Sequence, residues 1–169
     1  RYFMTVAFCG HSNYIGNKED EKRIIDFLEY RLKQKSCDFF LGGYGGFDNF
    51  CYTISKRYRE KYKDSKLIFI TPYIDEGYLR KRSGNSFDEI IYPQIENVPP
   101  RYAITHRNRW IVEKSDIIIA YVNHNYGGAY TMYKYNKKCK KEIQSLDKFY
   151  PEHSHLPKLN YGNILKTNK

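Results

Sequence analysis

Short apolar runs alternate with segments of helical periodicity along most of the chain, and this alternation limits the folds that the chain can adopt. Four runs have the length and composition of buried strands, at residues 4–9, 37–41, 66–71 and 116–122, and a weaker fifth run lies near 141–146. Apolar residues recur at helical spacing over 19–33, after Gly46, over 101–114 and over 128–140. Such an alternation is typical of a parallel sheet with helices on both faces. The sequence therefore predicts an α/β protein with a Rossmann-like, doubly wound parallel sheet of about five strands.

Two segments do not follow this alternation. Residues 73–100 form a long connection that is rich in tyrosine, proline and charge, and connections of this length often cover binding sites. Residues 147–169 contain two prolines and one glycine and show little periodicity. We therefore expect a single domain over residues 1–146, followed by an irregular C-terminal tail over 147–169.

The composition indicates which partners and compartments suit the chain. Its formal net charge of +10 favours polyanions such as nucleic acid or phosphate-bearing ligands, although lysines scattered over solvated helix faces would give the same total. The four cysteines form no CxxC pair and three of them lie in apolar patterns, so we expect free thiols in the cytoplasm and no metal site. No apolar run approaches the roughly 18 residues of a membrane span, so no membrane association is expected.

An unusual stretch of glycine, proline or polar residues follows each of the four stronger predicted strands. In a doubly wound sheet these positions share the edge at which ligands bind. Glycines let the backbone approach a ligand closely, and amides at a helix N-terminus attract phosphate. The predicted ligand-binding residues are therefore Gly10, His11 and Ser12 after the first strand, Gly42, Gly43, Tyr44, Gly45, Gly46, Phe47 and Asp48 after the second, Pro72 and Tyr73 after the third, and Asn123, Gly127, Gly128 and Ala129 after the fourth. The alternative is that the glycines only make turns.

Two common phosphate-binding motifs are absent from the sequence. No GxGxxG follows the first strand, and no Gly-Lys-Ser or Gly-Lys-Thr occurs, so we expect no dinucleotide cofactor and no ATP hydrolysis of the Walker type. Phosphate is instead expected at the backbone amides of 43–48 and 127–129. The rings of Tyr44, Phe47, Tyr73 and Tyr126 are candidates for stacking on a base.

A charged residue interrupts the apolar stripe of the predicted helix over 101–114. Arg107 and its neighbour Asn108 lie between two isoleucines on one helix face. A guanidinium inside an apolar stripe needs a partner. That partner is either a buried acid, Asp116 or Asp48, or the phosphate of a ligand. The N-terminal half of this helix lies near the ligand-binding edge, which favours the ligand and adds Arg107 and Asn108 to the predicted site.

Several segments together resemble the SLOG superfamily of Rossmann-like proteins. These are CGHSN, GGYGGFDNF, RYAITHRNRWIVEKSDIIIAYV and YGGAYTMYKYN, and the resemblance covers roughly residues 4–140 with the motifs in the same order. In this superfamily, the Lonely Guy branch hydrolyses the N-glycosidic bond of nucleoside monophosphates, and the DNA-processing branch binds single-stranded DNA. Other members sense nucleotide-derived signals in anti-phage defence. The resemblance implies a nucleotide or nucleotide-derived ligand.

The glycine-rich segment differs from that of the hydrolases at two positions. Gly42, Gly43 and Gly45 match their GGxG core, but Gly46 stands where they have threonine and Asn49 stands where they have the catalytic glutamate. An amide cannot act as a general base. Asp48 instead matches an aspartate of the DNA-processing branch, and the segment from Arg107 to Asp116 resembles the same branch.

The sequence therefore favours a protein that binds a nucleotide or nucleotide-derived ligand, as a sensor or a sequestering protein, with a link to anti-phage defence or its evasion implied by the resemblance alone. The enzymatic alternative is an N-glycosidic hydrolase with Asp48 and Arg107 as catalytic residues. The third alternative is a single-stranded DNA-binding protein. A homo-oligomer is expected in each case.

Overall fold

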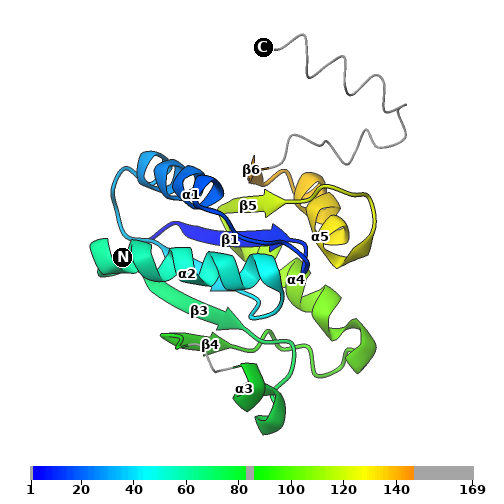
Figure 1. The fold of residues 1–169 in the computed structure, drawn as a ribbon. Coiled ribbons are helices and arrows are strands. Elements are labelled where there is room, and N and C mark those ends of the chain that lie inside the picture. Colours follow the sequence, from blue (N-terminus) through cyan, green and yellow to red (C-terminus); the bar gives the residue numbers. More distant parts are fainter. Residues whose placement is uncertain (1, 83–85, 147–169) are drawn as a thin grey trace, which may run out of the picture.

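The computed structural model describes residues 2–82 and 86–146 and contains one sheet of six strands (Figure 1). The strands are β1 (Thr5–Gly10), β2 (Asp38–Leu41), β3 (Lys66–Ile70), β4 (Glu89–Ile91), β5 (Ile117–Tyr121) and β6 (Glu142–Ser145). The helices are α1 (Lys18–Arg31), α2 (Gly46–Lys61), α3 (Glu76–Arg82), the short 3-10 helix η1 (Pro100–Tyr102), α4 (Ala103–Lys114) and α5 (Gly127–Lys138). All neighbouring strands are parallel, so the predicted α/β fold with a doubly wound sheet is confirmed.

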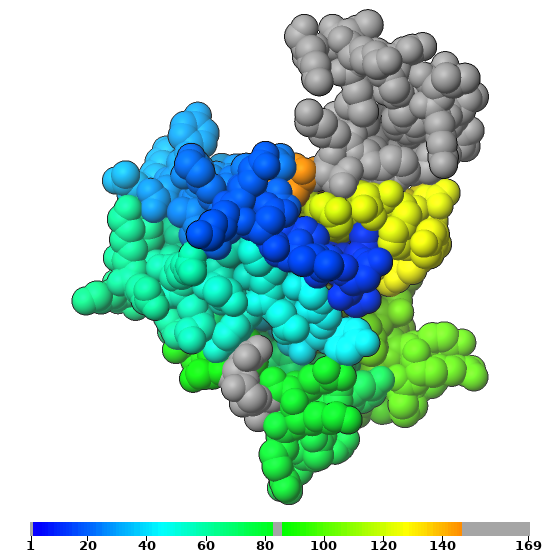
Figure 2. Space-filling model, in the orientation of Figure 1, coloured from blue at the N-terminus to red at the C-terminus, as the bar shows by residue number. Residues whose placement is uncertain are grey.

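The sheet has six strands rather than about five, because the connection over 73–100 is not structureless. It contains α3 and the edge strand β4. Neither element has an apolar periodicity that the sequence could reveal, since α3 buries no side chain and β4 is three residues long with two of them exposed. In the space-filling view, the green region that contains α3 projects from the bottom of the molecule (Figure 2). The predicted tail over 147–169 lies outside the described residues.

The sheet separates two hydrophobic cores. Successive side chains of β1 point to opposite faces, so that Val6 and Phe8 pack with α1 and α2, whereas Ala7 and Cys9 pack with α4 and α5. β5 is buried on both faces, which explains its continuous apolar sequence. Three of the four cysteines are buried and all four are free thiols, as predicted. None of the helices in the described ranges is long and apolar enough to cross a membrane.

The strand order β4-β3-β2-β1-β5-β6 fixes where a ligand can bind. From β1 the chain moves outward through β2, β3 and β4, and then returns to the other side of β1 with β5. The strand order therefore reverses between β1 and β5, and the loops that follow these two strands diverge toward opposite faces of the sheet. In open α/β sheets the crevice at this reversal, outside the carboxyl ends of the strands, is the ligand-binding position.

Candidate functional site

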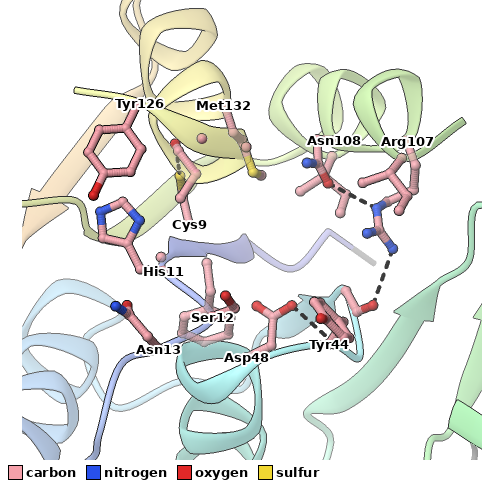
Figure 3. A pocket seen from close by; sticks show the side chains of 18 of the residues that line it. Cys9, His11, Ser12, Asn13, Tyr44, Asp48, Arg107, Asn108, Tyr126 and Met132 are labelled. Atoms are coloured by element: carbon pink, nitrogen blue, oxygen red, sulfur yellow. Dashed lines mark hydrogen bonds between the residues drawn. The ribbon is translucent and has the colours of Figure 1, made fainter. Parts of the chain in front are cut away.

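A cavity of about 480 Å³ opens at this reversal point (Figure 3). Its walls come from the segment after β1, the segment after β5 with the start of α5, the glycine-rich loop with the start of α2, and one face of α4. Its volume lies within the range of roughly 300–1,000 Å³ that is usual for small-molecule sites. The structure therefore places a ligand-sized cavity where the topology predicts one.

Most of the predicted site residues line this cavity. They are Gly10, His11, Ser12, Gly42, Tyr44, Asp48, Arg107, Asn108, Gly127, Gly128 and Ala129, and the candidate base-stacking residue Tyr126 joins them. The others, Gly43, Gly45, Gly46, Phe47, Pro72, Tyr73 and Asn123, do not line it. Pro72 and Tyr73 instead line a separate groove of about 240 Å³ beside η1. The ring of Phe47 is fully buried against the core, which excludes it as a base-stacking ring.

The sequence did not identify several residues of the cavity wall, namely Phe8, Cys9, Asn13, Ile104, Ile111, His124 and Met132. For some of them, the spacing in the sequence could have indicated a place in the cavity wall. Ile104 and Ile111 share a helix face with Arg107, and Met132 lies one turn after Gly128. Cys9 is buried, and its thiol donates to the carbonyl oxygen of Ala129 at 3.2 Å. Burial and, to a smaller extent, the charge of Asp48 raise the pKa of the Cys9 thiol, so it is not a thiolate nucleophile at neutral pH.

Packing and backbone conformation within the protein explain three of the four glycines of the loop, namely Gly43, Gly45 and Gly46. A Cβ atom at Gly46 would lie 2.1 Å from the carbonyl oxygen of Tyr14. At Gly45, which has φ +94°, it would lie 2.9 Å from the Cα atom of Ser12. Added Cβ atoms at Gly43 and Gly42 would lie 2.7 Å from the ring of Phe69 and 2.8 Å from Oδ2 of Asp48, respectively. The loop is glycine-rich because it passes directly against the segment that follows β1 and against its own neighbours.

In the same packing, several of the backbone amides of 43–48 that were expected to bind phosphate donate to groups of the protein itself. The amide of Gly46 donates to the carbonyl oxygen of Ser12 at 2.7 Å, and the amide of Phe47 donates to that of His11 at 3.4 Å. The amide of Tyr44 donates to Oδ2 of Asp48 at 3.4 Å. These amides are already used inside the protein. The expectation that this loop holds phosphate through them is therefore wrong for Tyr44, Gly46 and Phe47.

The glycine pair at the start of α5 differs from the loop. Among the described residues, no atom lies within 4 Å of a Cβ added at Gly127 or Gly128. Gly127 has φ +88° and so needs to be glycine, but Gly128 has neither a positive φ nor a close neighbour. Tyr126, at the N-cap, makes no side-chain bond to the first-turn amides of the described helix. Unpaired amides at an exposed helix start beside a cavity form an anion-binding position.

Arg107 lies on the opposite wall and is 5% exposed. Its Nη1 donates to the carbonyl oxygens of Ile70 at 2.7 Å and Gly42 at 3.2 Å, and its Nε donates to Oδ1 of Asn108 at 2.9 Å. Within the described part of the chain, Nη2 makes no hydrogen bond. Figure 3 shows the guanidinium at the edge of the cavity, with one nitrogen directed into it. The direct hydrogen-bond partners of Arg107 are thus carbonyls and an amide rather than a buried acid.

Of the two acids considered as partners, Asp116 is engaged elsewhere, since its carboxylate accepts from the hydroxyl of Tyr2 and the amide of Thr5. Asp48 does face Arg107 across Gly42. A Cβ at Gly42 would lie 2.8 Å from Oδ2 of Asp48 and 3.5 Å from Nη2 of Arg107. No ion pair within 4 Å joins the two charges, as judged over residues 2–82 and 86–146. Asp48 is the only acid among the described residues that line the cavity.

The carboxyl group of Asp48 is costly to ionise in this position. Burial raises its pKa to about 6, although the charge of Arg107 and the amide of Tyr44 both act to lower it. Asn49, at the position of the hydrolases' catalytic glutamate, is exposed and does not line the cavity. If the site has a catalytic carboxylate, it is Asp48.

Three stacked rings form a further wall. The ring centroids of His11 and His124 lie 3.6 Å apart, with an angle of 17° between the ring planes. The ring centroids of His124 and Tyr126 lie 4.0 Å apart, with an angle of 21° between the planes. Nε2 of His11 accepts from the amide of Asn123 at 3.1 Å, which places the proton of the neutral ring on Nδ1. Asn123 therefore supports the site without lining it. The last ring, Tyr126, is 68% exposed and offers a surface on which a base can stack.

Asp48→Asn is expected to stabilise the protein more at pH 8 than at pH 5. The folded pKa of about 6 lies above the ordinary 3.8, so the cost of the ionised carboxylate is present in full above pH 6 and disappears as the pH falls toward 4. The variant's gain in free energy of unfolding should therefore be larger at pH 8 by about 1–2 kcal/mol. Urea unfolding of both proteins at the two pH values measures this difference, and a gain that is equal at both would contradict the raised pKa.

No family model matches the sequence, and no curated protein matches it at a significant level. Solved structures do match. The fold resembles that of DNA processing protein A from Streptococcus pneumoniae, with a TM-score of 0.60, 13% sequence identity, and coverage of 98% of this chain and 56% of that chain. It also resembles DNA processing protein A from Helicobacter pylori, the subject of a structure of its single-stranded DNA binding mode, with a TM-score of 0.58, 16% identity, and coverage of 97% and 79%.

These similarities confirm the Rossmann-like fold that the sequence resemblance implied. At this level of identity the likeness shows the fold alone. The chain spans only about half the length of the Streptococcus pneumoniae protein, 56% of it, so much of that protein has no counterpart in this chain.

Proposed function

We propose that the protein binds a nucleotide or a nucleotide-derived ligand in the cavity between β1 and β5, with a phosphate group at the start of α5. The observation behind this proposal is Gly128. No contact with the described residues requires glycine there, and alanine favours a helix more than glycine does. A close approach by a ligand explains the residue.

Two further groups support a phosphate in this cavity. Nη2 of Arg107 makes no hydrogen bond to a described residue, and Figure 3 shows a guanidinium nitrogen directed into the cavity from the α4 wall. A guanidinium at a buried position is a strong anion partner. Asn108 accepts from Arg107 through Oδ1, so its Nδ2 donor is the group left for a ligand. The exposed ring of Tyr126 gives a base a stacking surface beside these donors.

Gly128→Val is expected to weaken nucleotide binding at least tenfold while leaving the fold intact. The branched side chain would occupy the open space over the first turn of α5 and keep a phosphate away from its amides. Calorimetric titration with a panel of nucleoside monophosphates measures the affinity, and thermal unfolding checks the fold. Thr131→Val, on the same helix but outside the cavity wall, is the matched control. Unchanged affinity in a folded Gly128→Val protein would place the phosphate elsewhere.

The same titrations test the enzymatic alternative. Chromatography of the incubated nucleotides would detect free base if the protein were an N-glycosidic hydrolase. Because Asn49 does not line the cavity and Asp48 is the one acid among its described lining residues, we expect no base release. Release by the wild type that is lost in Asp48→Asn would establish hydrolysis instead.

Single-stranded DNA is the second candidate ligand. Arg82, in the basic cluster Arg80–Arg82, lies 4.6 Å over the ring of Tyr44 at the mouth of the cavity. Such cation–aromatic surfaces bind single strands by stacking and phosphate contact. The Helicobacter pylori protein of similar fold is described as binding single-stranded DNA. A DNA-binding role would show an affinity for oligonucleotides that falls steeply with salt and depends on the cluster Arg80–Arg82.

A further inference from the structure

We infer that Asp48 selects ligands that present two adjacent hydroxyl groups, so that the cavity takes ribonucleotides in preference to 2′-deoxyribonucleotides. This inference rests on the proposed nucleotide-binding function and adds the sugar specificity of the same site.

The contacts of Asp48 leave most of its hydrogen-bonding capacity unused. Oδ2 accepts from the amide of Tyr44 at a long 3.4 Å. Within the described part of the chain, Oδ1 makes no hydrogen bond. Figure 3 shows the carboxylate directed into the cavity beside Ser12. A partly buried carboxylate that lacks donors is costly, and a ligand that supplies donors removes that cost.

The carboxylate cannot serve the phosphate. Both groups are anionic acceptors, so a phosphate next to Asp48 would be repelled and would bring it no hydrogen bond. The amides that suit phosphate lie at the start of α5, at Gly128. Asp48 lies in the first turn of α2, on another wall of the cavity. It therefore faces a different part of the ligand.

A vicinal diol supplies the hydrogen-bond donors that the carboxylate of Asp48 lacks. Two adjacent hydroxyls can donate to the two oxygens of one carboxylate, whereas a deoxyribose has only one hydroxyl at that position. The hydroxyl of Ser12, exposed beside the carboxylate, can add a further contact to the same diol. The absence of a side chain at Gly42 leaves room for the carboxylate, because a Cβ atom there would lie 2.8 Å from Oδ2.

The test compares ribo- and deoxyribo-compounds on wild type and Asp48→Asn by calorimetric titration. The probes are adenosine and guanosine monophosphates with their 2′-deoxy counterparts, and ribose 5-phosphate with 2-deoxyribose 5-phosphate as base-free controls. We expect wild type to prefer the ribo-compounds about tenfold, as for loss of one hydrogen bond to a charged group. In Asp48→Asn the preference should fall to less than about twofold, and thermal unfolding verifies that the variant is folded.

Each other outcome has a distinct meaning. Equal affinity for ribo- and deoxyribo-compounds in wild type overturns the inference but leaves the proposed function intact. So does a preference that persists in the Asp48→Asn protein. A preference for guanosine over adenosine nucleotides that ignores the sugar also overturns it, since the two donors on the guanine edge would then be the group that Asp48 binds. Failure of every nucleotide and sugar phosphate to bind contradicts the proposed function itself, and with it the inference.

Discussion

Gly46→Ala is expected to lower the free energy of unfolding by about 3 kcal/mol or more. The added methyl group would lie 2.1 Å from the carbonyl oxygen of Tyr14 and 2.9 Å from that of Ser12. Both contacts are with backbone atoms, so the overlap cannot be relieved by turning a side chain. Relief requires moving the segment after β1 away from α2, which also breaks the 2.7 Å hydrogen bond from the amide of Gly46 to Ser12. Urea unfolding measures the loss.

Gly128→Ala provides the matched control for this prediction. It makes the same chemical change in the first turn of the other cavity helix, but in open space, and should raise the free energy of unfolding by about 0.5 kcal/mol or less. The two substitutions should thus change the free energy of unfolding in opposite directions. If Gly46→Ala were as stable as wild type, the close approach between the glycine-rich loop and the segment after β1 would be wrong.

Arg107→Gln is expected to weaken nucleotide binding by roughly ten- to a hundred-fold, as for the loss of a charge-assisted hydrogen bond. It should also destabilise the protein, because the buried carbonyl oxygens of Gly42 and Ile70 lose their donor and Asp48 loses the cation opposite it. Calorimetric titration at a temperature well below the unfolding transition separates the two effects. Arg107→Lys, which keeps the charge without the planar fork, should recover part of the affinity.

Arg109→Gln is the control for charge alone. Arg109 is two residues further along α4, is exposed, and lies over the ring of Tyr135 outside the cavity wall. Its replacement should change nucleotide affinity less than twofold at moderate salt. Equal losses in the two variants would show that binding depends on the overall positive charge of the protein, as for a polyanion, rather than on one buried guanidinium.

The parts of the fold that the sequence predicted are those in which local pattern and burial agree. The sequence predicts β5 as a strand from its run of apolar residues, and the run is apolar because Ile117, Ile118 and Ile119 are buried on alternate faces of the sheet. α3 and β4 lie at the edge of the sheet and bury almost nothing, so their positions depend on contacts that leave no apolar pattern. The sequence located the edge of the sheet that carries the cavity for the same reason that it located the strands, since this edge is where the buried runs end.

The roles of the individual site residues were less predictable, because they depend on contacts between distant parts of the chain. Gly46 is a glycine on account of Tyr14, which is far from it in sequence. Phe47 is buried beneath Gly10, where an added Cβ atom would lie 2.3 Å from its ring. The partners of Arg107 are backbone carbonyls, and every residue type offers these, so no pattern in the sequence could point to them.

The contrast between the glycines has a consequence for how homologous sequences can vary. Gly43, Gly45 and Gly46 are held by contacts inside the protein, so a homologue that has lost its ligand must still keep Gly46 to fold. Gly128 has no such constraint from the described residues. In a lineage where no ligand is bound, genetic drift should therefore replace it with other residues, and the helix should become more stable. A glycine at this position in a diverging lineage would thus mark the members that still use the cavity, whereas the more conspicuous glycine-rich loop would mark only those that still fold.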